Sequence, residues 1–235
     1  MIFGATIDSG ATAWVLTSAA LVAFMTPGLA FFYAGMVRSK NVLGMLMQNF
    51  FAMGLISVLW AVAGFSLAFG GSGKYIGNFD FALMKDLATI ESLPGYTGDF
   101  ALAIPVLAFF AYQMMFAIIT PALITGAFIN RVTFKSYVFF LILWQIFVYY
   151  PFVHMVWGGG ILQEWGVLDF AGGIVVHATA GFAALVAVIY VGKRNDTEHQ
   201  PNNIPLVAIG TALLWFGWYG FNAGSELDMN AITVS

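Results

Sequence analysis

Long runs of apolar residues alternate with short polar segments along the whole chain. The runs cover residues 11–34, 42–69, 100–128, 136–156, 171–191 and 203–221. A helix needs about 20 mostly apolar residues to cross the hydrocarbon core of a bilayer, whereas the strands of a membrane barrel alternate polar and apolar positions over about ten residues. These runs do not alternate. The pattern therefore predicts an all-α, polytopic membrane helix bundle that spans a lipid bilayer six times.

Composition and charge support the same class. Of the 235 residues, 61% are hydrophobic and only 8% are charged, against about 45–50% and about 25% in soluble domains. So few charged side chains cannot cover a water-facing surface. The net charge of −3 argues against a nucleic-acid partner. The absence of cysteine excludes disulfides, thiolate metal sites and a cysteine nucleophile.

Basic residues are grouped in alternate loops, which predicts an orientation. The loops after the first, third and fifth runs hold six of the eight Lys and Arg residues: Arg38, Lys40, Arg131, Lys135, Lys193 and Arg194. Basic residues next to membrane spans mark the cytoplasmic side. We therefore expect an integral protein of the plasma or inner membrane, with its N-terminus and the long loop 70–99 outside.

Two histidines, His154 and His177, lie inside apolar runs, where an ionisable group is costly and indicates function. Their spacing of 23 residues does not suit a metal site, and we expect no metal and no cofactor. Small residues share the side of the helix that carries His177. His177 is either a core histidine bonded across a tight helix contact or a pore-lining group that handles protons near neutral pH. A pairing with Asp169 lacks a nucleophile elbow, so we expect no enzyme.

Aromatic and polar residues gather near the predicted outer face. Trp157 precedes three glycines, which allow an unusual backbone turn beside the indole, and an indole face attracts small cations. Phe221 and Ser225 end the sixth run, Asp169 opens the fifth, and Phe116 lies nearer the middle of the membrane. This set is compatible with an entry site for a small cation and equally with a stacked aromatic core.

Four longer strings carry a resemblance to a known family. They are MTPGLAFFYAGMVRSKNVL at 25–43, HMVWGGG at 154–160, LDFAGGIVVH at 168–177 and GWYGFNAGS at 217–225. From about residue 13 to residue 225, the chain resembles the ammonium transporter (Amt/Mep/Rh) family in its Amt branch. Because that family usually has eleven spans in an inverted repeat, the resemblance implies that 1–235 is the first half of the membrane domain plus the next helix, incomplete at its C-terminus.

The resemblance also implies a function and roles for particular residues. It implies ammonium recruitment at Trp157, Phe116 and Ser225, and a gate formed by Phe116 and Phe221. It implies that His177 lines the pore and handles protons, and that Asp169 and Tyr112 support the outer vestibule.

For partners, the resemblance implies ammonium or ammonia as the substrate, a homotrimer, and a PII signal protein on the cytoplasmic face. The alternative function is an ammonium sensor that uses the same membrane fold to signal to a soluble domain or to a PII-type partner.

Overall fold

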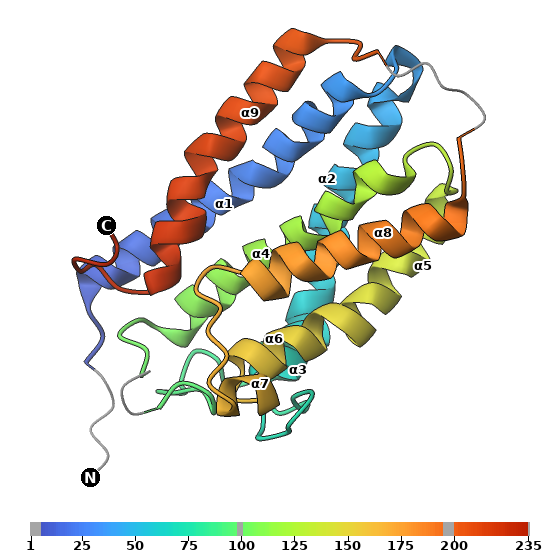
Figure 1. Cartoon of the computed structure of the whole chain (residues 1–235). Coiled ribbons are helices and arrows are strands. Elements are labelled where there is room, and N and C mark those ends of the chain that lie inside the picture. The colour runs from blue at the N-terminus through green and yellow to red at the C-terminus, as the bar shows by residue number, and fades with distance from the viewer. Residues whose placement is uncertain (1–5, 98–100, 195–199, 235) are drawn as a thin grey trace.

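The computed structural model describes residues 6–97, 101–194 and 200–234, and all regular secondary structure in these ranges is helical. Six helical segments are long and apolar enough to cross a membrane: Ser9–Met36, Ser39–Phe69, Val106–Phe128, Phe134–Glu164, Gly173–Val191 and Ile204–Glu226. The predicted all-α membrane bundle is confirmed. Figure 1 shows the helices arranged as an elongated bundle, with several of them steeply inclined to one another.

Several spans combine an α-helix with a π-helical turn. The α-helices are α1 (Ser9–Met36), α2 (Val42–Leu59), α3 (Phe65–Phe69), α4 (Val106–Phe128), α5 (Phe134–Trp144), α6 (Tyr150–Trp157), α7 (Ile161–Glu164), α8 (Thr179–Val191) and α9 (Ile204–Trp218). The π-helical turns are Trp60–Gly64, Gln145–Tyr149, Gly173–Ala178 and Tyr219–Ala223. Such turns are rare and occur frequently at functional sites. The last two contain His177 and Phe221.

The third spanning helix begins later than the apolar run predicted. It starts at Val106, and residues 101–105 are not helical. Pro105 precedes the first helical residue with φ of −57° and ψ of 140°. A proline ring fixes φ and pushes the preceding residue away from helical backbone angles, so the helix cannot extend smoothly through this position.

Glycines allow α9 to lie directly against α1 along its length (Figure 1). A Cβ added to Gly210 would lie 2.3 Å from the backbone nitrogen of Phe32, and one added to Gly217 would lie 2.2 Å from the side chain of Met25. Small residues at helix contacts let the backbones approach closely. α4 contacts α1, α2 and α8 and is the most buried of the six spans, so it forms the centre of the bundle.

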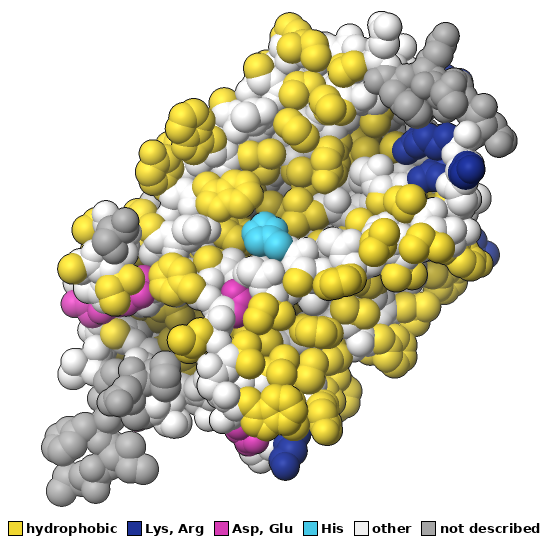
Figure 2. All heavy atoms as spheres, in the orientation of Figure 1, with side chains coloured by type: hydrophobic (Ala, Val, Ile, Leu, Met, Phe, Trp, Pro, Cys, Tyr) yellow, Lys and Arg dark blue, Asp and Glu magenta, His cyan; other side chains and the backbone are white. Residues whose placement is uncertain are grey.

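Charged residues separate to the two ends of the bundle. At the end where α1 begins and α6 stops, the described acidic residues gather: Asp8, Asp80, Asp86, Glu91, Glu164, Asp169, Glu226 and Asp228. We call this the acidic end, although Lys74 and Lys85 also lie there. The opposite, basic end carries Arg38, Lys40, Arg131, Lys135, Lys193 and Arg194. On the face that Figure 2 shows, most blue side chains gather at one corner, apart from the magenta ones.

Candidate functional site

A cavity of about 690 Å³ opens at the acidic end of the bundle. Five of the residues proposed from the sequence line it: Tyr112, Phe116, Trp157, Asp169 and Ser225. They come from α4, from the end of α6, from the loop before α8 and from the short helix after α9. Residues separated by up to 113 positions therefore surround one space.

Two phenylalanines close the inner side of this cavity. The rings of Phe116 and Phe221 lie 4.4 Å apart at an interplanar angle of 32°, and each side chain is 1% exposed. The rings of Trp157 and Phe116 lie perpendicular to each other, with centres 6.2 Å apart. Phe116 lines the cavity and Phe221 lies behind it, so the phenylalanine pair forms the inner wall of the cavity.

Hydrogen bonds fix the backbone that carries Phe221. The hydroxyl of Tyr112 lies 2.9 Å from the carbonyl oxygen of Gly220 and 3.1 Å from that of Phe221, and its single O–H is shared between these two acceptors. Ser225 donates to the carbonyl of Phe221 across 2.8 Å, and its Oγ lies 3.2 Å from the Tyr112 hydroxyl. The carbonyls in this π-helical turn thus receive donors from side chains, which holds the turn and its phenylalanine in place.

Asp169, which was predicted to open the fifth span, lies four residues before the helical segment that begins at Gly173. Its carboxylate accepts hydrogen bonds from the backbone N–H groups of the turn that follows, at 2.7–2.9 Å: Gly172, Gly173, Ile174 and Val175. A carboxylate at a helix N-terminus satisfies donors that have no partner inside the helix. Both carboxylate oxygens are occupied in this way, so Asp169 acts here as a cap.

His177 lies just beyond the phenylalanine pair. Its ring stacks on Trp218, with centres 6.1 Å apart and planes inclined by 7°, and lies 5.8 Å from the ring of Phe221. The side chain is exposed. In the part of the chain that the structure describes, its imidazole has no hydrogen-bond partner.

The sequence interpretation missed Trp218 and Gln113. Trp218 precedes Phe221 by three residues, so helical spacing places both on one side, and this spacing could have pointed to the stack on His177. Gln113 lines the acidic-end cavity, and within the described ranges its buried Oε1 has no hydrogen-bond partner. One turn of helix separates Gln113 from Phe116, which is the signal that could have identified it.

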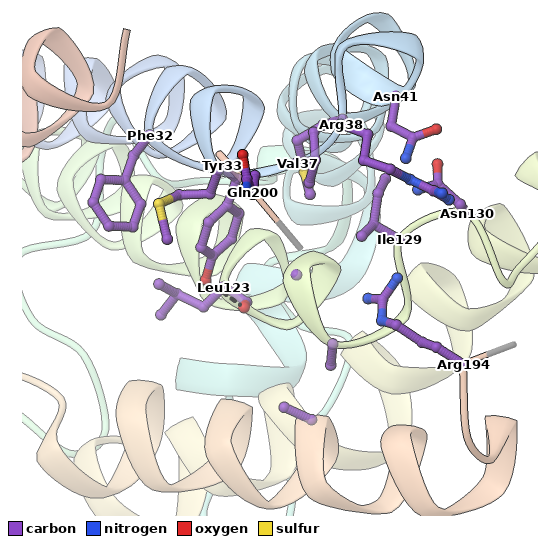
Figure 3. Close-up of a pocket in the computed structure, with 15 residues that line it drawn as sticks. Phe32, Tyr33, Val37, Arg38, Asn41, Leu123, Ile129, Asn130, Arg194 and Gln200 are labelled. Carbon is purple, nitrogen blue, oxygen red and sulfur yellow. Dashed lines mark hydrogen bonds between the residues drawn. The ribbon is translucent and has the colours of Figure 1, made fainter. Parts of the chain in front are cut away.

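A second cavity, of about 600 Å³, lies at the basic end between α1, α4 and the segment after α8. In Figure 3, Tyr33 points to Leu123, and its hydroxyl donates to the Leu123 carbonyl across 3.0 Å. Arg38 and Arg194 line the cavity from different elements. Burial, together with the positive charges of Arg131 and Arg38, lowers the pKa of Arg194. Ala184 of α8 also lines this cavity, seven residues after His177.

The described site residues therefore follow one another in a defined order. Trp157, Ser225 and the Asp169 turn surround the acidic-end cavity, the phenylalanine pair closes it, and His177 with Trp218 lies behind the pair. α8 follows the turn that holds His177 and contributes Ala184 to the cavity at the basic end. This order suits the stepwise selection of a small molecule along the bundle.

Comparison with known proteins gives a consistent result. The family model described as "Ammonium Transporter Family" matches residues 13–235. The ammonium transporter of Aquifex aeolicus is 48% identical over 229 residues, which is 96% of this chain and 52% of the relative. Ammonium transporter 1 of Dictyostelium discoideum is 47% identical over 235 residues, 97% of this chain and 50% of the relative.

Solved structures agree with the sequence matches. The crystal structure of Candida albicans Mep2 superposes with a TM-score of 0.86 at 32% identity, covering 97% of this chain and 51% of that one. A structure described as "Sensor Amt Protein" gives a TM-score of 0.85 at 31% identity, covering 96% and 56%. The chain spans about half the length of the curated relatives it matches. By sequence and by structure, the chain belongs to the ammonium transporter family.

Proposed function

We propose that this protein transports ammonium or ammonia across a membrane, with the acidic end outside. The observation that carries the proposal is the order of Trp157, the Phe116–Phe221 pair and His177 along the bundle. This order offers an aromatic cation site, then an apolar closure, then an imidazole. The family membership and the names of the relatives support the same substrate.

The first step is the recruitment of the ammonium ion at the acidic-end cavity. Glu226 and Asp228 line this cavity, and acidic residues around a cleft raise the local concentration of cations. The faces of Trp157 and Phe116 then offer cation–π attraction, which contributes about 2 kcal/mol when the ion is desolvated. The hydroxyl oxygen of Ser225 supplies an acceptor for an ammonium N–H.

The second step is the loss of a proton at the phenylalanine pair. Taking a small cation out of water into an apolar interior costs at least several kcal/mol, more than the cation–π contact returns. Neutral ammonia avoids this cost. An ion of similar size without a transferable proton, such as potassium, would have to cross with its charge and is rejected.

The third step is the transfer of this proton to the imidazole of His177, which lies directly behind Phe221. An imidazole can gain and lose a proton near neutral pH, and its contact with Trp218 leaves both ring nitrogens without hydrogen bonds in the described residues. In this proposal Asp169 and Tyr112 do not touch the ion. Asp169 accepts the indole N–H of Trp157 at its backbone carbonyl across 2.7 Å, and Tyr112 holds the Phe221 turn through the hydrogen bonds given above.

The proposal extends to location and assembly. We expect the protein to lie in the plasma or inner membrane as a homotrimer with the N-terminus outside, and to meet a PII signal protein at the basic, cytoplasmic end. A sensor role for the same fold is the alternative. Transport is preferred because the curated relatives named above are ammonium transporters.

The test is ammonium uptake by the full-length protein reconstituted in vesicles. The wild type should move ammonium and exclude potassium. Trp157→Leu should raise the ammonium concentration needed for half-maximal uptake, because the cation site is lost. Trp165→Leu is the matched control, since Trp165 is exposed near the same end and does not line the cavity. Absence of uptake by the wild type would refute the proposed function and favour the sensor alternative.

A further inference from the structure

The loop between α3 and α4 turns back along the second membrane-spanning helix. The turn Ala82–Met84 contacts the π-helical turn Trp60–Gly64, which lies inside that span. The backbone N–H of Phe81 donates to the hydroxyl oxygen of Ser66 across 2.9 Å, and the ring of Phe81 lies 6.3 Å from that of Phe65. The loop is therefore fastened to the side of the helix and does not simply extend away from its end.

The length of the helix gives the depth of this contact. The span Ser39–Phe69 has 31 residues, which make about 46 Å of helix at 1.5 Å per residue. A bilayer with its headgroup regions is about as thick, whereas its hydrocarbon core measures about 30 Å. The turn Trp60–Gly64 ends about 8 Å before the end of the span. The loop turn Ala82–Met84 packed against it therefore reaches the boundary between headgroups and acyl chains.

Protein covers the last part of this span. Exposed apolar side chains recur along the helix on its outer side: Leu43, Met47, Phe50, Val58 and Val62. They stop there, because every residue of α3 is buried, and α6 and the loop turn pack against it. At the level of α3, the loop therefore takes the place that the helix has further down, on the outside of the bundle.

The loop presents large apolar side chains at this depth. Leu83 is 75% exposed, Phe79 is 66% exposed and Met84 is 40% exposed. Phe81 and Leu87 in the same segment pack against the core of the bundle. Grouped exposed apolar side chains mark an interaction surface. Beside a membrane-spanning helix and at the edge of the hydrocarbon core, the surface that fits them is the lipid itself.

The backbone of the segment fixes the direction of these side chains. Leu83, Met84 and Asp86 have φ values of 57°, 61° and 60°. Residues other than glycine rarely adopt such left-handed angles, which persist only where the surrounding structure enforces them. The packed side chains of Phe81 and Leu87 hold the segment on both sides of the turn. The outward direction of Leu83 and Met84 is therefore built into the fold of the loop.

The charges of the segment indicate how it would bind lipid. Residues 74–86 contain two lysines, Lys74 and Lys85, and two aspartates, Asp80 and Asp86, so their net charge is zero. Such a segment gains little from anionic lipid and depends on its buried apolar area. The Lys85 side chain can keep its stem among acyl chains while its ammonium group reaches the phosphates.

We propose that Phe79–Met84 is an interfacial anchor, which inserts Phe79, Leu83 and Met84 into the lipid leaflet at the acidic end. The lipid phosphates meet Lys85, which follows the inserted side chains. The anchored loop also holds the bundle, because the N–H of Ile161 in α7 donates to the carbonyl of Lys74 across 2.8 Å. The anchor does not depend on what the protein transports.

The test places spin labels on the full-length protein in phosphatidylcholine vesicles. Residues 1–235 contain no cysteine, so one introduced cysteine in a cysteine-free background carries the label. Oxygen concentrates among acyl chains and a nickel chelate stays in water, so the ratio of their collision rates with the label reports depth. Leu83→Cys carries the tested label. Val58→Cys, exposed on α2, is the lipid reference, and Ser92→Cys, exposed in the same loop, is the water reference.

We expect the oxygen-to-nickel ratio at Leu83 to exceed that at Ser92 at least several-fold and to stay below that at Val58, which lies deeper. A ratio at Leu83 equal to that at Ser92 would place the turn in water and overturn the proposal. Low collision rates with both reagents would mean that protein covers the turn, as in a contact with a second copy of the chain, and would overturn it as well.

A second experiment keeps the label at Met84→Cys and changes Leu83. Leu83→Asp brings a charge to the edge of the hydrocarbon core, so the ratio should fall at least several-fold, whereas Leu83→Met should leave it unchanged. An unchanged ratio in Leu83→Asp would contradict insertion through apolar side chains. Adding phosphatidylglycerol to the vesicles should have no effect, and insertion only in its presence would overturn the uncharged anchor. Neither experiment measures transport, so the outcome is independent of the proposed function.

Discussion

The indole N–H of Trp157 donates a hydrogen bond to the backbone carbonyl of Asp169 across 2.7 Å. Through its carboxylate the same aspartate accepts four backbone N–H groups of the turn that carries His177. One residue thus links the aromatic lining of the acidic-end cavity to the start of the helix that holds the imidazole. A disturbance at Asp169 must therefore reach both parts of the proposed pathway.

The first prediction concerns this link. Asp169→Ala removes an acceptor from four backbone N–H groups, and we expect it to lower the free energy of unfolding by about 2–3 kcal/mol. Asp169→Asn keeps one acceptor oxygen and should lose less. Thermal unfolding in detergent would measure both. Asp8→Ala is the control, because Asp8 caps α1 through a single hydrogen bond, to the N–H of Ala11; an equal loss in Asp8→Ala and Asp169→Ala would contradict the interpretation.

Much of the fold could be predicted from the sequence because the bilayer imposes a simple rule. A segment in hydrocarbon must satisfy its own backbone polar groups, so long apolar runs become helices whatever their side chains. The rule does not locate helix ends that depend on a single residue, as at Pro105. It also gives no signal for the π-helical turns, because an extra residue in a turn leaves no periodic mark in an apolar run.

The site was predictable to a different extent. The strings around Trp157, His177 and Phe221 pointed to the residues through a resemblance, and the structure brings these residues together. Their roles stay predictions. The bonds that join Tyr112 to the turn of Phe221 connect positions 108 and 109 residues apart. Such contacts depend on how α4 and α9 cross α1, which no local pattern contains.

The second prediction concerns the phenylalanine pair. Replacing Phe221 by Ala removes the ring that stacks on Phe116 and opens a path between the cavity and His177. We expect a potassium current that the wild type lacks, measured in planar bilayers, and a loss of about 3–5 kcal/mol in stability. Phe109→Ala is the matched control: Phe109 is buried like Phe221, but its ring packs on Phe65, Phe69 and Tyr96 and not on Phe116, so the variant should lose stability without passing potassium. Potassium current in both variants would show that general loosening, not the pair, causes the leak.

The third prediction concerns His177. If the imidazole takes the proton, His177→Ala should reduce ammonium uptake by about 10²-fold or more, the range by which positioned proton-transfer groups contribute. Trp218→Phe is the companion variant, because it keeps an aromatic ring against the imidazole and should retain most of the uptake. Isotope-labelled methylammonium influx into vesicles would measure both. Unchanged uptake and unchanged selectivity in His177→Ala would remove His177 from the mechanism.

The fourth prediction concerns the basic end, where Arg131 joins α4 to α8. Its guanidinium donates to the carbonyl of Ala127 in α4 and to that of Gly192 just after α8. Lysine has no planar fork to reach both carbonyls, so Arg131→Lys should cost about 1–3 kcal/mol of stability. The exposed Lys135 lies four residues away, and Lys135→Ala should stay within about 0.5 kcal/mol of the wild type. Chemical unfolding of the two variants side by side measures the difference, and an equal effect would mean that charge at this end matters rather than the two hydrogen bonds. Because α8 continues directly from the turn that holds His177, we also expect Arg131→Lys, but not Lys135→Ala, to reduce uptake.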